Sequence, residues 1–130
     1  MARDVEAQLN YIESLISSVD AQIDAINKMV LEVQTTIQIL SSDELRQSKE
    51  RLISVGSGIF ANGNLDLDSD LIVPIGSGVY IAEKRSETIE RLKANIENLK
   101  ESIQKLMDQR RTLVDQYNTV YTTEATRNIK

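Results

Sequence analysis

The chain has 130 residues with 15 basic and 20 acidic side chains, and it contains neither cysteine nor histidine. These two absences exclude disulfides, thiolate or imidazole metal ligands and acid–base catalysis by histidine. The charged residues form no basic cluster of the kind that binds nucleic acid, and no apolar run reaches the roughly 18 residues of a membrane span. We therefore expect a cytoplasmic protein with no nucleic-acid partner and no membrane association.

Residues 1–47 are predicted to form a long helix, because aliphatic side chains recur at alternating spacings of four and three residues. An apolar repeat of about 3.5 residues is the pattern of a coiled coil, in which heptad positions a and d face a partner helix. With Leu9 at an a position, the seam comprises Val5, Leu9, Ile12, Ile16, Val19, Ile23, Ile26, Val30, Val33, Ile37 and Leu40. The helix therefore needs a partner along its length.

Residues 50–82 contain the glycines and the only proline, and they carry an internal repeat at an offset of 20 residues. Val55–Ala61 (VGSGIFA) matches Ile75–Ile81 (IGSGVYI), and a short apolar run precedes each copy. Each copy is predicted to form a strand, a Gly-Ser-Gly turn and a second strand, so the segment holds two tandem β-hairpins.

The pair Asn62-Gly63 is a competing turn signal within residues 59–67, which it could divide into two strands. We prefer one long strand with Gly63 at a bulge, because the repeat already supplies the turns. Isolated hairpins are marginal in water, so their apolar side chains are expected to join strands of other subunits. The predicted assembly residues are Ile53, Val55, Ile59, Phe60, Leu71, Val73, Ile75, Val79 and Ile81.

Residues 86–127 are predicted to form the second long helix, with Ser86 as its N-cap. Its seam comprises Ile89, Leu92, Ile96, Leu99, Ile103, Leu106, Arg110, Leu113, Tyr117 and Val120. Arg110 is the only charged residue in this seam. It either extends its guanidinium towards Asp20 or Asp24 of the first helix, or fixes the register of the pair.

Two heptad helices around a non-helical middle predict an α+β fold that is mostly α. It is a long antiparallel two-helix coiled coil with two tandem β-hairpins between the helices. The pairing brings residues 5–16 beside residues 113–124, where the apolar stripe is wider than two helices can bury. The predicted contact surface at this end of the coil comprises Leu9, Tyr11, Ile12, Leu15, Leu113, Tyr117, Val120 and Tyr121.

Two short motifs invite other interpretations, which their contexts reject. Gly56–Ala61 fits the dinucleotide fingerprint G-x-G-x-x-A, but that loop must open a helix, and here a strand-forming run follows. Asp66, Asp68 and Asp70 resemble the start of a calcium loop, but Leu71 occupies the position that requires glycine. We therefore expect no enzyme activity, no catalytic residues, no metal site and no cofactor.

The order helix, two hairpins with repeated Gly-Ser-Gly turns, helix resembles the alpha class of prefoldin subunits of archaeal type. The most specific part of the resemblance is the tandem repeat Val55–Gly58 and Ile75–Gly78, followed by the run Val79–Ser86 into the second helix. The beta class of the family has one hairpin, so two hairpins indicate the alpha class.

The resemblance implies a hexamer of two alpha and four beta subunits, with the hairpins assembled into a central hub. It also implies an ATP-independent chaperone, whose coil ends hold unfolded polypeptides and pass them to a group II chaperonin. On this interpretation the contact surface at the end of the coil binds clients. The alternative is a structural coiled-coil adaptor that binds one folded partner through the same ends.

Overall fold

The structure is a computed structural model that describes residues 2–47 and 49–129. Helix α1 spans Ala2–Ser41, a short helix α2 spans Asp43–Arg46, and helix α3 spans Arg85–Ile129. Four strands lie between α2 and α3 in the chain: β1 (Arg51–Gly56), β2 (Ile59–Gly63), β3 (Leu71–Gly76) and β4 (Val79–Glu83). The predicted fold class, two long helices that flank two hairpins, is confirmed. Within the described residues, neither long helix has a stretch apolar enough to cross a membrane.

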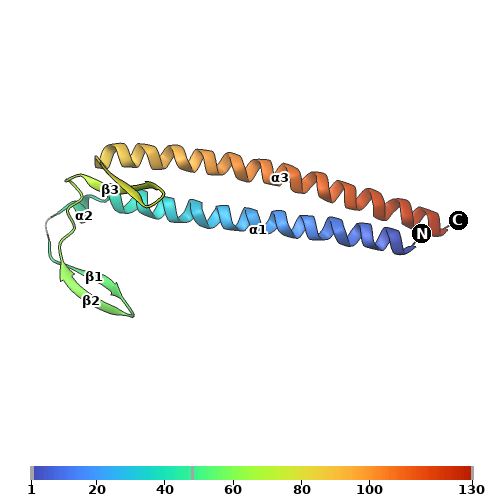
Figure 1. Cartoon of the computed structure of the whole chain (residues 1–130), viewed down its shortest axis with the longest axis horizontal. Helices are drawn as coiled ribbons and strands as arrows, with labels where there is room; N and C mark the ends of the chain where they lie inside the picture. Colours follow the sequence, from blue (N-terminus) through green and yellow to red (C-terminus); the bar gives the residue numbers. More distant parts are fainter. Residues whose placement is uncertain (1, 48, 130) are drawn as a thin grey trace. The chain divides into compact units, whose positions relative to one another are not determined.

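The chain divides into two compact units, one formed by residues 1–31 with 97–130 and the other by residues 32–96. We call the first the coil unit and the second the hairpin unit. In the coil unit the start of α1 and the end of α3 run side by side in opposite directions, as the blue and red segments of Figure 1 show. The antiparallel pairing predicted from the two heptad repeats is confirmed.

The heptad seam is the core of the coil unit. Ile12 and Val19 are each 6% exposed, and Val30 is 9% exposed. The other aliphatic a and d residues of this unit are half-buried, as two helices with no third layer over them require. The seam stabilises the pair along a line, and the side chains that flank it stay in contact with solvent.

The two hairpins are separate two-stranded antiparallel sheets, β1 with β2 and β3 with β4. Both turns are Ser-Gly pairs with positive φ, at 53° and 75° in the first hairpin and 52° and 75° in the second. Two successive left-handed residues form the type I′ turn, whose twist matches that of paired strands. The predicted hairpins and their Gly-Ser-Gly turns are therefore confirmed.

The predicted bulge at Gly63 is wrong. Gly63 ends β2 in regular pairing with Arg51, and residues 64–70 form no strand. The irregularity lies instead between Ser54 and Gly56, and at the matching place between Pro74 and Gly76 in the second hairpin. The extra residue is therefore in the first strand of each hairpin, immediately before the turn.

In the hairpin unit, the residue at which the first long helix ends and the residue at which the second begins differ from those expected from the sequence. The first helix ends at Ser41, because Ser42 adopts an extended conformation and its hydroxyl accepts the N–H of Leu45 at 3.2 Å, which caps α2. The prediction that Ser86 caps the second long helix is wrong. The N–H of Thr88 already donates to the carbonyl of Lys84 at 2.9 Å, so Ser86 lies inside the first turn of α3.

The core of the hairpin unit joins the helices to β3 and the linker between the hairpins. Its buried residues are Leu40, Leu67, Val73, Thr88 and Ile96, each at most 8% exposed. The guanidinium of Arg85 donates to the carbonyl of Leu40 at 2.7 Å. This bond places a positive charge at the C-terminal end of α1, whose own last turn has no basic residue, and so stabilises that end.

Candidate functional site

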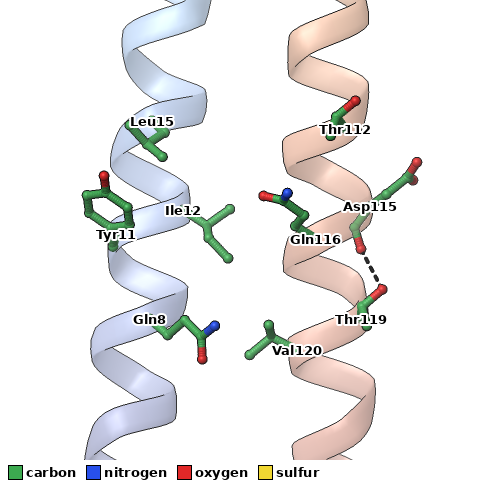
Figure 2. A pocket seen from close by; sticks show the side chains of 9 residues that line it. All are labelled: Gln8, Tyr11, Ile12, Leu15, Thr112, Asp115, Gln116, Thr119 and Val120. Atoms are coloured by element: carbon green, nitrogen blue, oxygen red, sulfur yellow. Dashed lines mark hydrogen bonds between the residues drawn. The ribbon is translucent and has the colours of Figure 1, made fainter.

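A groove of about 630 Å³ lies between the helices of the coil unit, near the start of α1 and the end of α3. Figure 2 shows Gln8, Ile12, Gln116 and Val120 directed into the space between the two helices. The lining residues are Gln8, Tyr11, Ile12 and Leu15 from α1, and Thr112, Asp115, Gln116, Thr119 and Val120 from α3. The groove therefore has an apolar floor from the seam and a polar rim from residues beside it.

A second groove of about 420 Å³ continues the first along the same side of the pair, because both are lined by Leu15 and Thr112. From Gln8 to Gln22 of α1 the two grooves extend about 21 Å, given a rise of about 1.5 Å per residue. We call the two together the coil groove. It is long enough to accept several residues of an extended polypeptide.

The coil groove has almost no charge. Asp115 is the only acidic residue that lines it, and no basic residue does so among the residues that the structure describes. In Figure 2 the carboxylate of Asp115 points away from the space between the helices, while its backbone carbonyl accepts the hydroxyl of Thr119 at 2.9 Å. The groove therefore offers apolar contact and neutral donors and acceptors, the amides of Gln8, Gln22, Gln109 and Gln116.

The tyrosines near the end of α3 form a separate cluster. The hydroxyl of Tyr117 donates to the carboxylate of Glu13 at 3.0 Å, and this bond raises the pKa of Tyr117. The ring of Tyr117 stacks on that of Tyr121, with centroids 6.5 Å apart and planes inclined by 7°. In an antiparallel pair the g positions meet on one side of the seam and the e positions on the other. Glu13 and Tyr121 occupy e positions, so this cluster lies on the side opposite the coil groove.

The eight residues of the predicted contact surface are thus divided. Tyr11, Ile12, Leu15 and Val120 line the first groove and Leu113 lines the second, whereas Leu9, Tyr117 and Tyr121 line neither. The polar rim of the groove was not predicted from the sequence: it comprises Gln8, Ser18, Gln22, Gln109, Thr112, Gln116 and Thr119. Their g and c positions in the heptads carry the signal, because those positions flank the seam on one side of an antiparallel pair.

Arg110 forms an ion pair across the coil unit. Its Nε donates to Oδ1 of Asp20 at 2.6 Å, and its Nη2 donates to Oδ2 at 3.5 Å. Both side chains are nearly half exposed, at 45% and 49%. The guanidinium therefore leaves the seam for solvent at the predicted partner Asp20, and exposed pairs of this kind add little stability.

Replacing Arg110 with Leu is expected to raise the midpoint of thermal unfolding by a few degrees, because an a position regains an apolar side chain. Circular dichroism at 222 nm measures the midpoint, with Asp20→Asn as the control that removes only the ion pair. Asp20→Asn is expected to shift it little. If Arg110 fixes the register instead, Arg110→Leu broadens the transition and yields species of other masses by light scattering.

Most of the exposed large apolar side chains of the hairpin unit belong to the strands of the two hairpins. Six of the nine predicted assembly residues are exposed: Val55, Ile59, Phe60, Ile75, Val79 and Ile81. Leu52, Ile72 and Tyr80 are about as exposed or more so, at 70%, 68% and 61%, and they were not among the predicted assembly residues. Ile53 and Leu71 are half-buried, and Val73 is 7% exposed because it packs within its own chain. Val73 therefore serves the fold of the unit.

Each hairpin also exposes two unpaired strand edges, since each sheet has only two strands. Unpaired N–H and C=O groups along an edge can add a strand from another chain.

Near the end of the second hairpin, hydrogen bonding by Thr88 and then contact with Arg91 lower the pKa of Glu83. Arg91 Nε lies 3.2 Å from both carboxylate oxygens. This pair fixes the junction of β4 with α3.

The chain is similar in sequence to known proteins along its whole length. The family model described as "Prefoldin subunit" matches residues 12–130. The chain is 69% identical to "Prefoldin subunit alpha" of Thermoplasma acidophilum over 130 residues, the full length of both. It is 41% identical to "Prefoldin subunit alpha" of Picrophilus torridus over 88 residues, which are 68% of this chain and 63% of that one.

A chain in a cryo-EM structure of filamentous PFD from Methanocaldococcus jannaschii is 17% identical, with a TM-score of 0.48 over 98% of this chain and 95% of that chain. The family model covers far more than half of the chain, and the Thermoplasma relative is similar from end to end. The chain therefore belongs to the prefoldin family of chaperone subunits, and its relatives are of the alpha class.

Proposed function

We propose that this chain assembles with beta-class prefoldin subunits, two alpha with four beta, through its hairpins. The support is the exposed apolar surface of both hairpins together with their open strand edges. A two-stranded sheet is marginal alone, so burial against further strands is the arrangement that would stabilise it. The full-length similarity to an alpha subunit agrees with this role.

The assembled complex is proposed to hold unfolded polypeptides without ATP, by contacts at the ends of its coils. The observation that carries this proposal is the coil groove, with its apolar floor and with Asp115 as the one charged residue among its described lining residues. An unfolded chain exposes apolar side chains and unpaired backbone amides, and the groove offers partners to both. Several weakly binding arms on one hub would add their affinities by multivalency.

We further propose that the complex delivers the held polypeptide to a group II chaperonin. This delivery takes place in the cytoplasm, and the chain catalyses no reaction in it. This step rests on the family to which the chain belongs, and no residue is assigned to it. The alternative is an adaptor whose coil ends bind one folded protein. That role would require a surface that complements a single partner, whereas the coil groove is mostly apolar and neutral and offers little to select one partner.

The experiment uses the complex formed with a co-expressed beta-class subunit, whose mass is measured by light scattering after size exclusion. Chemically denatured citrate synthase is then diluted into buffer without nucleotide, and aggregation is followed by turbidity. We expect a mass of two alpha and four beta chains and suppression of aggregation at about one complex per citrate synthase chain. The beta-class subunit alone and native citrate synthase are the controls. Saturable binding of one folded protein with no effect on denatured chains would support the adaptor instead.

A further inference from the structure

The two hairpins are held to the chain in different ways. In the second hairpin, Val73 of β3 is buried at 7% exposure, and β3 lines a cleft of about 370 Å³ with Leu40 and Leu92 of the helices. In β1 and β2, all of whose residues the structure describes, none is buried. The second hairpin is therefore anchored by packing, and the orientation of the first must come from the segments at its two ends.

Helix α2 contacts both of those segments. Arg46 at the end of α2 donates from Nε to Oδ1 of Asp68, in the linker between the hairpins, at 2.9 Å. The carbonyl of Glu44 in α2 accepts Nη2 of Arg51, the first residue of β1, at 2.5 Å. One short helix thus binds the first residue of the first hairpin and the linker that follows the hairpin.

The linker that receives Arg46 is itself ordered. Oδ1 of Asp66 accepts the N–H groups of Asp68 and Ser69, each at 3.1 Å, which closes an Asx turn. Hydrogen bonds from Ser69 and, to a smaller extent, from the N–H of Asp68 lower the pKa of Asp66. The carboxylate of Asp66 therefore stays ionised and continues to accept the N–H groups that form the turn. Leu67, between the two aspartates, is buried at 8% exposure. The carboxylate of Asp68 is therefore presented from a fixed turn with an anchored neighbour.

We propose that Arg46 is a positioning residue for subunit assembly, which clasps the linker at Asp68 and so sets the direction of the first hairpin. The inference rests on the proposed assembly of the hairpins. The ion pair closes the loop that contains the whole of the first hairpin, since its partners are 22 residues apart. An exposed pair adds little to the stability of one chain. The Arg46–Asp68 ion pair acts on assembly instead, because a hairpin that is already held in the orientation of the complex loses less conformational entropy on docking.

The test compares Arg46→Asp, Asp68→Arg and the double variant that exchanges the two charges. Each chain is titrated with the beta-class subunit at low ionic strength, and native mass spectrometry measures the concentration at which half of it is in the full complex. Each single variant is expected to raise this concentration about fivefold, the equivalent of an ion pair of about 1 kcal/mol. The exchanged variant is expected to lie much closer to wild type than either single variant. It does not return fully, because Nη1 of Arg46 also lies 3.7 Å from Oδ1 of Asp43, and a carboxylate at position 46 loses that second contact. Asp70→Arg is the matched control, since Asp70 forms no ion pair among the described residues, and it should assemble as wild type does.

Two further outcomes separate this proposal from its premise. Amide hydrogen exchange should show the same protection of β1 and β2 in the single variants as in wild type. The reason is that the Arg46–Asp68 ion pair orients the first hairpin and is not needed for its strands to pair. A wild-type chain that fails to assemble with the beta-class subunit contradicts the proposed function. The proposed function stands, but the role of the Arg46–Asp68 ion pair is contradicted, if the wild-type chain assembles and Arg46→Asp assembles equally well. The same conclusion follows if the exchanged variant assembles no better than the single variants.

Discussion

Replacing Ile59, Phe60, Val79 and Ile81 with serine is expected to abolish assembly with the beta-class subunit while leaving the helicity of the chain nearly unchanged. All four side chains are between 41% and 60% exposed in the single chain, so its own fold does not depend on their burial. Burying a fully exposed large apolar side chain contributes about 1.5–3 kcal/mol, and roughly half of that is expected for each of these partly covered side chains. The variant removes four of the nine exposed large apolar side chains of the hairpin strands in each alpha subunit. Size exclusion with light scattering measures the mass, and circular dichroism measures the helicity.

The control for this experiment is a pair of equally exposed apolar residues on the helices. Ile39 is 42% exposed and Met107 is 48% exposed, and neither belongs to a hairpin. Ile39→Ser with Met107→Ser should assemble normally. A full-size complex from the hairpin variant would place the assembly surface elsewhere, and loss of assembly by the control variant would implicate the helices.

Replacing Tyr11 and Leu15 with serine is expected to leave assembly intact and to reduce protection of a denatured client several-fold. Both residues line the coil groove, and Tyr11 is 65% exposed, so the seam residues Ile12 and Val19 remain packed. Because several arms contribute to each client, the loss of affinity at each modified arm is multiplied in the complex. Turbidity of diluted citrate synthase measures protection, with the mass of the complex checked first.

The matched control is Tyr121→Ser. Tyr121 is 60% exposed, close to the value for Tyr11, but it stacks on Tyr117 on the side of the pair opposite the groove. This variant should protect the client as wild type does. If it loses protection and the groove variant keeps it, the stacked tyrosines are the client surface and the coil groove is not.

Much of the fold follows from local rules that act within the sequence. The heptad spacing selects the seam, because a side chain every 3.5 residues or so can face only one partner helix. The antiparallel pairing follows from a chain that must return, and it correctly brings Arg110 to Asp20. The repeated Gly-Ser-Gly segments specify both turns, because few residues other than glycine adopt a positive φ at little cost.

The predictions that were wrong concern places where two local signals compete. Ser42 and Ser86 are both acceptable N-caps by residue type, yet only Ser42 adopts the extended conformation of a cap. In α3 the hydrogen bond from Thr88 to Lys84 extends the helix past Ser86. The bulge expected at Gly63 does not form, because β2 ends there, opposite Arg51, the first residue of its partner strand β1.

By itself, the sequence determined two heptad helices, their antiparallel pairing and two tandem hairpins, since each of these depends on neighbours in the chain or on a regular spacing. Once the antiparallel pairing is accepted, the heptad positions also place Tyr11 and Tyr121 on opposite sides of the pair. Only the tertiary structure decided that one of these sides is hollowed into the coil groove and that Val73 packs inward. It also joined Arg46 to Asp68. These features depend on how closely neighbouring side chains pack and on contacts between distant residues. A periodic pattern of apolar side chains carries no record of either.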